Sequence, residues 1–178
     1  TQGVSSAASD VYKRQVLELS RIESGNMSFH CEDCSAHHFA ETVYQTHQVI
    51  ILPPVEFIKE FPDEDVTIHI DRMRLTQVIT NFLGNAKKFT SQGHIKLGYF
   101  CDKEKKEIHF FVEDTGAGIP KEELQMIFER FYKRNEFVQG VGLGLAISKV
   151  IVEKMNGHID VQSEVNKGSR FTAVLPYL

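Results

Sequence analysis

Three polar side chains, Asn81, Asn85 and Lys88, follow one another at spacings of four and three residues. Such spacings place side chains along one stripe of a helix. Two carboxamides and an ammonium group on one stripe suit a hydrated Mg²⁺ ion with phosphate oxygens, because Mg²⁺ takes oxygen ligands and is usually shared with a nucleotide. The solvated face of any amphipathic helix has the same spacing, so the stripe alone leaves both interpretations open.

A second candidate group is the segment DTGAGI, from Asp114 to Ile119. Asp114 shares its parity with the apolar residues of the preceding run, so we expect its carboxylate to point where apolar side chains point. A carboxylate in such a place needs a hydrogen-bond donor, and the amino group of adenine would be one. Gly116 and Gly118 would let a ligand approach the backbone closely. An Asx turn ending a strand is the alternative.

A third candidate is the glycine loop GVGLGL, with Gly140, Gly142 and Gly144 directly before a predicted helix. Free amide groups and the positive end of the helix dipole make such a loop suitable for phosphate. Its spacing differs from the dinucleotide-binding fingerprint and from the Walker motif. The polar residues 133–139 before it, next to the aromatic segment IFERFY, could form a lid or an ordinary connection.

These residues need a scaffold, and hydrophobic periodicity predicts one. The strongest helix signal covers residues 71–89, with Asp71 as N-cap and an apolar stripe of Leu75, Val78, Ile79, Phe82, Leu83 and Ala86. Further helices are expected over 35–49, 120–128 and 143–155, with the end of another over 16–23. Strands are expected over 27–31, 55–61, 66–70, 94–100, 107–113, 158–164 and 170–175.

Helices and strands alternate, but several neighbouring strands are connected as hairpins, which disfavours a purely parallel sheet. We therefore predict an α/β two-layer sandwich: a mixed β-sheet covered on one face by helices, with an N-terminal helical stub. Residues 1–15 are rich in Ser, Ala and Gln, and we interpret them as a tag, a linker or a remnant.

Composition excludes some functions. The chain has 178 residues and a formal net charge of −4, without the basic footprint of a nucleic-acid-binding protein. Three cysteines and no signal-peptide pattern favour a reducing compartment, the cytoplasm. Cys31, Cys34, His37 and His38 have a passing likeness to a zinc site, but Cys31 is in phase with apolar neighbours, so we predict packing rather than metal binding.

Five segments, in this order, resemble the N, G1, F, G2 and G3 boxes of the sensor histidine kinase catalytic domain: NFLGNAKKFT (81–90), DTGAGIP (114–120), IFERFY (127–132), GVGLGLAI (140–147) and KGSRF (167–171). That family belongs to the superfamily of gyrase, heat-shock chaperone, histidine kinase and mismatch-repair ATPases (GHKL), which has the Bergerat fold. The resemblance covers about residues 16–178. It implies the end of a dimerisation helix over 16–25 and the ATP-binding catalytic domain over 26–178.

The resemblance implies roles for individual residues. Asn85 would coordinate Mg²⁺, with Asn81 beside it, and Lys88 would reach the phosphates of ATP. Asp114 would bind the adenine amino group. Gly116 and Gly118 would leave room for adenine, and Tyr132 and Lys133 would flank the nucleotide where the lid begins. The phosphates would be wrapped by Gly140, Gly142 and Gly144. Val141 stands where the family often has threonine.

The implied function is a Mg²⁺- and ATP-binding phosphotransferase domain that donates the γ-phosphate to a histidine on a separate dimerisation domain. The full-length protein would be a homodimer with a response regulator as partner. The resemblance leaves open whether that longer protein is anchored in the inner membrane. A GHKL-type ATPase is the alternative, but its general base would be a glutamate at the position of Asn81. An inactive nucleotide-binding module would show damaged boxes. None of the eight histidines has the acceptor context, so we expect the chain alone not to label itself.

Overall fold

The computed structural model describes residues 2–133 and 142–177. In chain order its elements are α1 (Gln2–Glu23), β1 (Glu32–Ser35), α2 (Ala36–Gln48), β2 (Val55–Glu60), β3 (Thr67–Ile70), α3 (Arg72–Phe89), β4 (Gly93–Asp102), β5 (Glu107–Asp114), the 3-10 helix η1 (Lys121–Glu123), α4 (Gly144–Lys154), β6 (His158–Glu164) and β7 (Gly168–Pro176).

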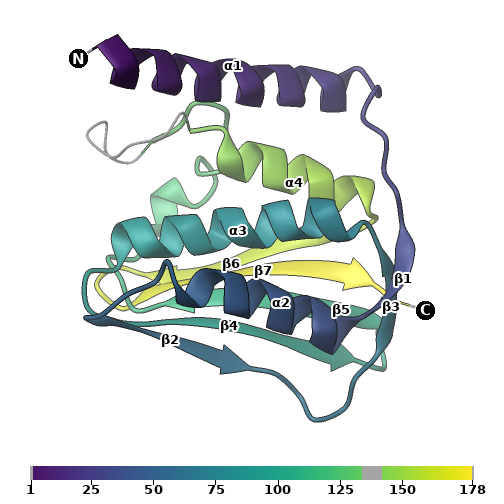
Figure 1. The fold of residues 1–178 in the computed structure, drawn as a ribbon. Helices are drawn as coiled ribbons and strands as arrows, with labels where there is room; N and C mark the ends of the chain where they lie inside the picture. Colours follow the sequence, from purple (N-terminus) through teal and green to yellow (C-terminus); the bar gives the residue numbers. More distant parts are fainter. Residues whose placement is uncertain (1, 134–141, 178) are drawn as a thin grey trace.

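The main sheet has five strands in the order β2-β4-β5-β7-β6, and β1 pairs with β3 in a separate two-stranded sheet. Strand β2 runs parallel to β4, whereas the other neighbours are antiparallel. Helices α2, α3 and α4 lie over one face of this sheet, and α1 lies on the far side of α3 and α4 (Figure 1). The predicted two-layer α/β sandwich with an N-terminal helical element is confirmed.

Helix α3 is the central element of the helical layer. It begins where predicted, because the Asp71 side chain caps it by accepting a hydrogen bond from the Arg74 amide at 3.0 Å. All six residues of its predicted apolar stripe are buried, and the ring of Phe82 contacts Phe171 of the sheet. The stripe fixes the rotation of α3, and with it the direction of the neighbouring polar stripe.

Elements both before and after α3 differ from the sequence prediction. Residues 27–31 form no strand; the strand begins at Glu32 and pairs with β3, and Cys31 is exposed, so the packing predicted for it is wrong. The strands predicted over 55–61 and 66–70 are present as β2 and β3 but do not pair with each other, because β2 joins the main sheet and β3 the small one. Over 120–128 the structure has only the short 3-10 helix η1.

At the N-terminus, α1 begins well before residue 16. Leu19 and Ile22, on its last turns, are buried in the common core. Arg74 and Gln77 of α3 each donate a hydrogen bond to Glu18, at 3.0 Å and 2.8 Å. The C-terminal half of α1 is therefore packed onto the sandwich. Over the described residues, no helix combines the length and apolar character required to cross a membrane.

Candidate functional site

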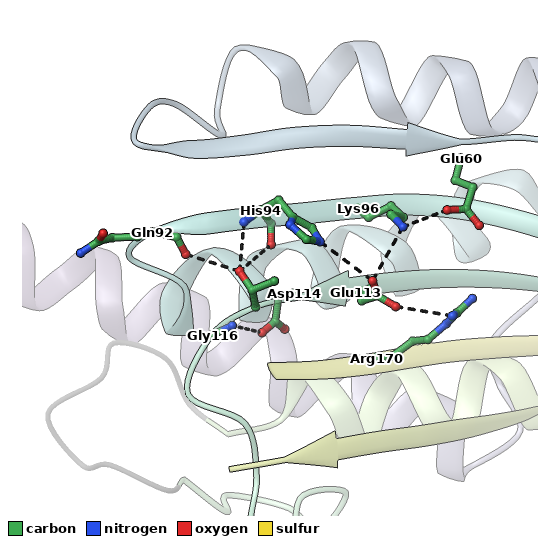
Figure 2. A network of polar contacts seen from close by, with 9 residues as sticks. Glu60, Gln92, His94, Lys96, Glu113, Asp114, Gly116 and Arg170 are labelled. Carbon is green, nitrogen blue, oxygen red and sulfur yellow. Dashed lines mark hydrogen bonds and ion pairs between the residues drawn. The ribbon is translucent and has the colours of Figure 1, made fainter. Parts of the chain in front are cut away.

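Asp114 is the last residue of β5, and its side chain is only 7% exposed. The Gly116 amide donates a hydrogen bond to its carboxylate at 2.8 Å, next to the ion pairs that Glu113 makes on the opposite side of the strand (Figure 2). Burial raises the pKa of Asp114, and the amides of Gly116 and Ser169 oppose that rise. The Thr90 hydroxyl lies beside the carboxylate but outside hydrogen-bond geometry.

The segment 114–119, which we call the Asp114 loop, is held by backbone contacts. The Ala117 amide donates to the Phe89 carbonyl at 3.2 Å, at the end of α3. A Cβ on Gly116 would collide with that same carbonyl oxygen, and one on Gly118 with the Glu164 carbonyl oxygen. These glycines are therefore required by close packing within the protein, a reason that the sequence prediction did not include.

Thr115 fastens the other side of the Asp114 loop. Its hydroxyl accepts a hydrogen bond from the His94 amide at 3.0 Å, and its own amide donates to the His94 carbonyl at 3.2 Å. Gly93, with φ of +93°, allows β4 to begin directly against the Thr115 side chain. The loop is thus joined to both α3 and β4, which fixes the direction of the Asp114 carboxylate.

The polar stripe of α3 faces a pocket of about 280 Å³. Asn81, Asn85 and Lys88 line one wall of this pocket, as the spacing predicted. The facing wall comes from α4 and α1, and its polar members are Ser148, Glu18 and Gln15. Carboxamide oxygens are suitable ligands for Mg²⁺, so the donor set of this wall fits that ion.

Asn81 is less free than its neighbour on the stripe. Its amide nitrogen donates a hydrogen bond to the Ser148 hydroxyl at 3.1 Å, and a Cβ on Gly144 would collide with its side-chain oxygen. Gly144 therefore lets α4 begin directly against α3, in addition to any contact with phosphate. Asn85 lines the pocket one turn further along and is half-buried.

Lys88 lies at the open end of the stripe. Partial burial of its ammonium group, and then the charge of Lys133, lower the pKa of Lys88. The residue as a whole remains exposed, so solvent screens both effects. Two cationic side chains whose charges repel each other favour an anion between them.

The remaining predicted site residues lie near the base of the predicted lid. The Tyr132 hydroxyl donates to the Glu123 carboxylate at 2.9 Å. Gly142 has φ of +76°, and its carbonyl accepts a hydrogen bond from the Phe131 amide at 2.8 Å. Gly140 and residues 134–139 of the predicted lid lie outside the described residues.

The structure thus groups the predicted residues along the C-terminal half of one helix and at its C-terminal end. Asn81, Asn85, Lys88 and Gly144 line the pocket beside α3, and the Asp114 loop lies against the end of the same helix. Sequence reasoning missed Ser148 and Ser163, since a lone serine on a helix or strand carries no pattern. Ser169 lay within the KGSRF segment but was not singled out.

Comparison with known proteins identifies the relatives of this chain. Residues 70–178 match the family described as "Histidine kinase-, DNA gyrase B-, and HSP90-like ATPase". Sensor histidine kinase WalK of Bacillus subtilis is 34% identical over 167 residues, covering 91% of this chain and 27% of WalK. Sensor protein SrrB of Staphylococcus aureus is 44% identical over 110 residues, covering 60% of this chain and 19% of SrrB. The chain thus spans about a quarter or less of these relatives.

Solved structures agree with these sequence matches. The full-length histidine kinase ShkA, in complex with AMPPNP, superposes with a TM-score of 0.82 at 28% identity, over 92% of this chain and 34% of that protein. The catalytic domain of histidine kinase ThkA gives 0.73 at 28% identity, over 85% of this chain and 97% of that domain. The chain therefore belongs to the family of histidine kinase-, DNA gyrase B- and HSP90-like ATPases, and its fold is that of a sensor histidine kinase catalytic domain.

Proposed function

We propose that this chain binds Mg²⁺ and ATP and donates the γ-phosphate to a histidine on a separate helical domain, as the catalytic domain of a two-component sensor kinase. The observation that carries the proposal is the placement of two unlike groups beside α3. A buried carboxylate at one place suits the adenine amino group, and a pocket with carboxamides and an ammonium group suits a metal ion and phosphates.

Each residue has a role that fits its surroundings. The Gly116 amide holds the Asp114 carboxylate in place. The carboxylate can then accept a hydrogen bond from the amino group of adenine. Asn85 offers a carboxamide oxygen to Mg²⁺, and Lys88 neutralises phosphate charge. When bound, Mg²⁺ supplies charge neutralisation between phosphate oxygens. No side chain of the chain needs to bond covalently to the phosphoryl group, since catalysis of this kind depends on positioning.

Hydrolysis is a poorer fit to the same pocket. Water attack would need a carboxylate free to accept a proton. Asn81 is a carboxamide, and the lining carboxylate Glu18 already accepts hydrogen bonds from Arg74 and Gln77. We infer that transfer to an external histidine is the reaction this pocket serves.

The test uses γ-labelled ATP and Mg²⁺, with the chain alone and with a histidine-bearing helical domain from its own parent protein or a close relative. We expect nucleotide binding by calorimetry, no stable label on the chain alone, and weak labelling of the added domain, because tethering normally supplies a high effective concentration. Absence of any ADP or ATP binding would refute the proposal. The full-length homodimer and the response regulator remain proposals of the same kind.

A further inference from the structure

Ser163, the last residue but one of β6, uses one hydroxyl group for three contacts. Its oxygen accepts a hydrogen bond from the Ile119 amide at 2.7 Å. It lies 3.0 Å from the Gly168 carbonyl oxygen, to which it donates, and 2.8 Å from the Ser169 hydroxyl. The hydroxyl therefore joins the distant Asp114 loop to the end of β6 and the beginning of β7.

The hydrogen-bond capacity of serine fixes the direction of these contacts. A hydroxyl has one proton and two lone pairs. If the Ser163 proton goes to the Gly168 carbonyl, both lone pairs accept, one from the Ile119 amide and the other from the Ser169 hydroxyl. All three bonds can then exist together, and the capacity of Ser163 is used completely.

The Ser163 hydroxyl lies between the two segments that flank the Asp114 carboxylate, which are the Asp114 loop and the beginning of β7. Ile119 ends the Asp114 loop, and Ser169 is the β7 residue that pairs with Asp114 and whose backbone amide acts to lower the pKa of that carboxyl group. Between them, the Asn166 amide donates to the Ala117 carbonyl at 2.8 Å, and Gly118 packs on the Glu164 carbonyl. The β6–β7 turn and the Asp114 loop thus lie backbone against backbone, with Ser163 as the side chain that connects them.

We propose that Ser163 is a positioning residue for recognition of the adenine amino group, a statement that rests on the proposed function. Ser163 is not one of the predicted nucleotide-binding residues, and it lies outside the five motif segments. It holds the Asp114 loop at Ile119 and the start of β7 at Ser169, and these two points fix the carboxylate between them. Without the hydroxyl, the Ile119 amide turns to water, because the site of Ser163 is half-buried.

The readout is discrimination between two nucleotides rather than affinity alone. ADP and purine ribonucleoside 5′-diphosphate differ only in the amino group that Asp114 would read. Calorimetry gives the dissociation constant of the purine ribonucleoside diphosphate divided by that of ADP, which we call the ratio. It is measured for the parent chain, for Ser163→Ala and for Ser163→Thr, which keeps the hydroxyl. The exposed neighbour Gln162, replaced by Ala, is the matched control on the same strand.

We expect Ser163→Ala to lose ADP affinity on the order of tenfold, the equivalent of one hydrogen bond, with the ratio falling toward one. Ser163→Thr and Gln162→Ala should keep the parent's ratio. An unchanged ratio in Ser163→Ala, or an equal loss for both nucleotides, would overturn the inference while leaving the proposed function intact. A parent chain that binds neither nucleotide would overturn both.

Should Ser163→Ala fail to fold, the isosteric pair Ser163→Thr and Ser163→Val answers the question. Both side chains are β-branched and suit a strand, and they differ only by a hydroxyl in place of a methyl group. A lower ratio in the Val variant than in the Thr variant supports the positioning role. Equal ratios, or a Thr variant that also loses discrimination, contradict it.

Discussion

Replacing Asp114 by Asn separates the binding role of this residue from its effect on stability. Asp114 is 7% exposed, and the Gly116 amide donates a hydrogen bond to its carboxylate. A carboxamide of the same shape keeps one oxygen for that amide but presents a donor in place of the second oxygen. Toward adenine it loses a charge-assisted acceptor, a loss of about 1.5–3 kcal/mol. That corresponds to about 10- to 150-fold weaker ADP binding.

Stability should move the other way or not at all. Because burial raises the pKa of Asp114, the folded protein favours the neutral form of this carboxyl group. The stabilisation that comes from its protonation is fully present below the unfolded pKa and is lost as pH rises through the folded pKa. An Asn side chain does not ionise, so the variant does not lose stability in this way as pH rises. We expect Asp114→Asn to melt at or above the parent's temperature at neutral pH, with the difference shrinking as pH falls.

The assay is thermal unfolding with and without ADP over a pH series, together with calorimetry at neutral pH. Ser91→Ala, at an exposed position near the end of α3, serves as the control for a change at the surface. If Asp114→Asn bound ADP as tightly as the parent, the assignment of the base-reading carboxylate would be wrong. A fall of many degrees in melting temperature at neutral pH would mean that the carboxylate is a structural group instead.

Three further predictions concern other parts of the chain. Asn85→Ala should weaken ADP binding in the presence of Mg²⁺ far more than in EDTA, because it removes a metal ligand; equal losses by calorimetry would point to a structural role. Ile22→Ala, at a residue 1% exposed, should lower the free energy of unfolding by about 2–4 kcal/mol in urea, whereas Leu17→Ala, 58% exposed, should change it little; similar effects would mean that α1 is not packed on the sandwich. Incubation with γ-labelled ATP should leave the chain itself without stable label, and a labelled histidine within it would contradict the absence of an acceptor.

The parts of the fold that could be predicted are the helices and strands in which buried residues recur at a fixed spacing along the chain. The apolar stripe of α3 and the alternation of β6 are of this kind, and both elements lie within a few residues of the predicted bounds. The site residues on α3 followed from the same periodicity, because the polar stripe is defined by the apolar stripe beside it.

The parts that could not be predicted depend on partners distant in sequence. Strand β1 has little burial pattern of its own, with Glu32 and Asp33 exposed, and exists because β3 pairs with it. The parallel pairing of β2 with β4 crosses α3 and leaves no local mark. Ser148 and Ser163 likewise acquire their roles only when the fold brings Asn81 and Ile119 beside them.

Strand β5 restricts where the chain can change in length. Its alternate residues Ile108, Phe110 and Val112 enter the core on the side of Asp114, whereas Phe111 lies beneath the Arg170 guanidinium on the opposite face, at 3.7 Å. Inserting one residue between Val112 and Asp114 would leave the apolar set in the core and turn the carboxylate to that opposite face. The β4–β5 turn at 103–106, at the other end of the strand, carries no such constraint. A reporter group or an affinity tag introduced into this protein therefore belongs in that turn, where added length leaves the frame of the strand unchanged.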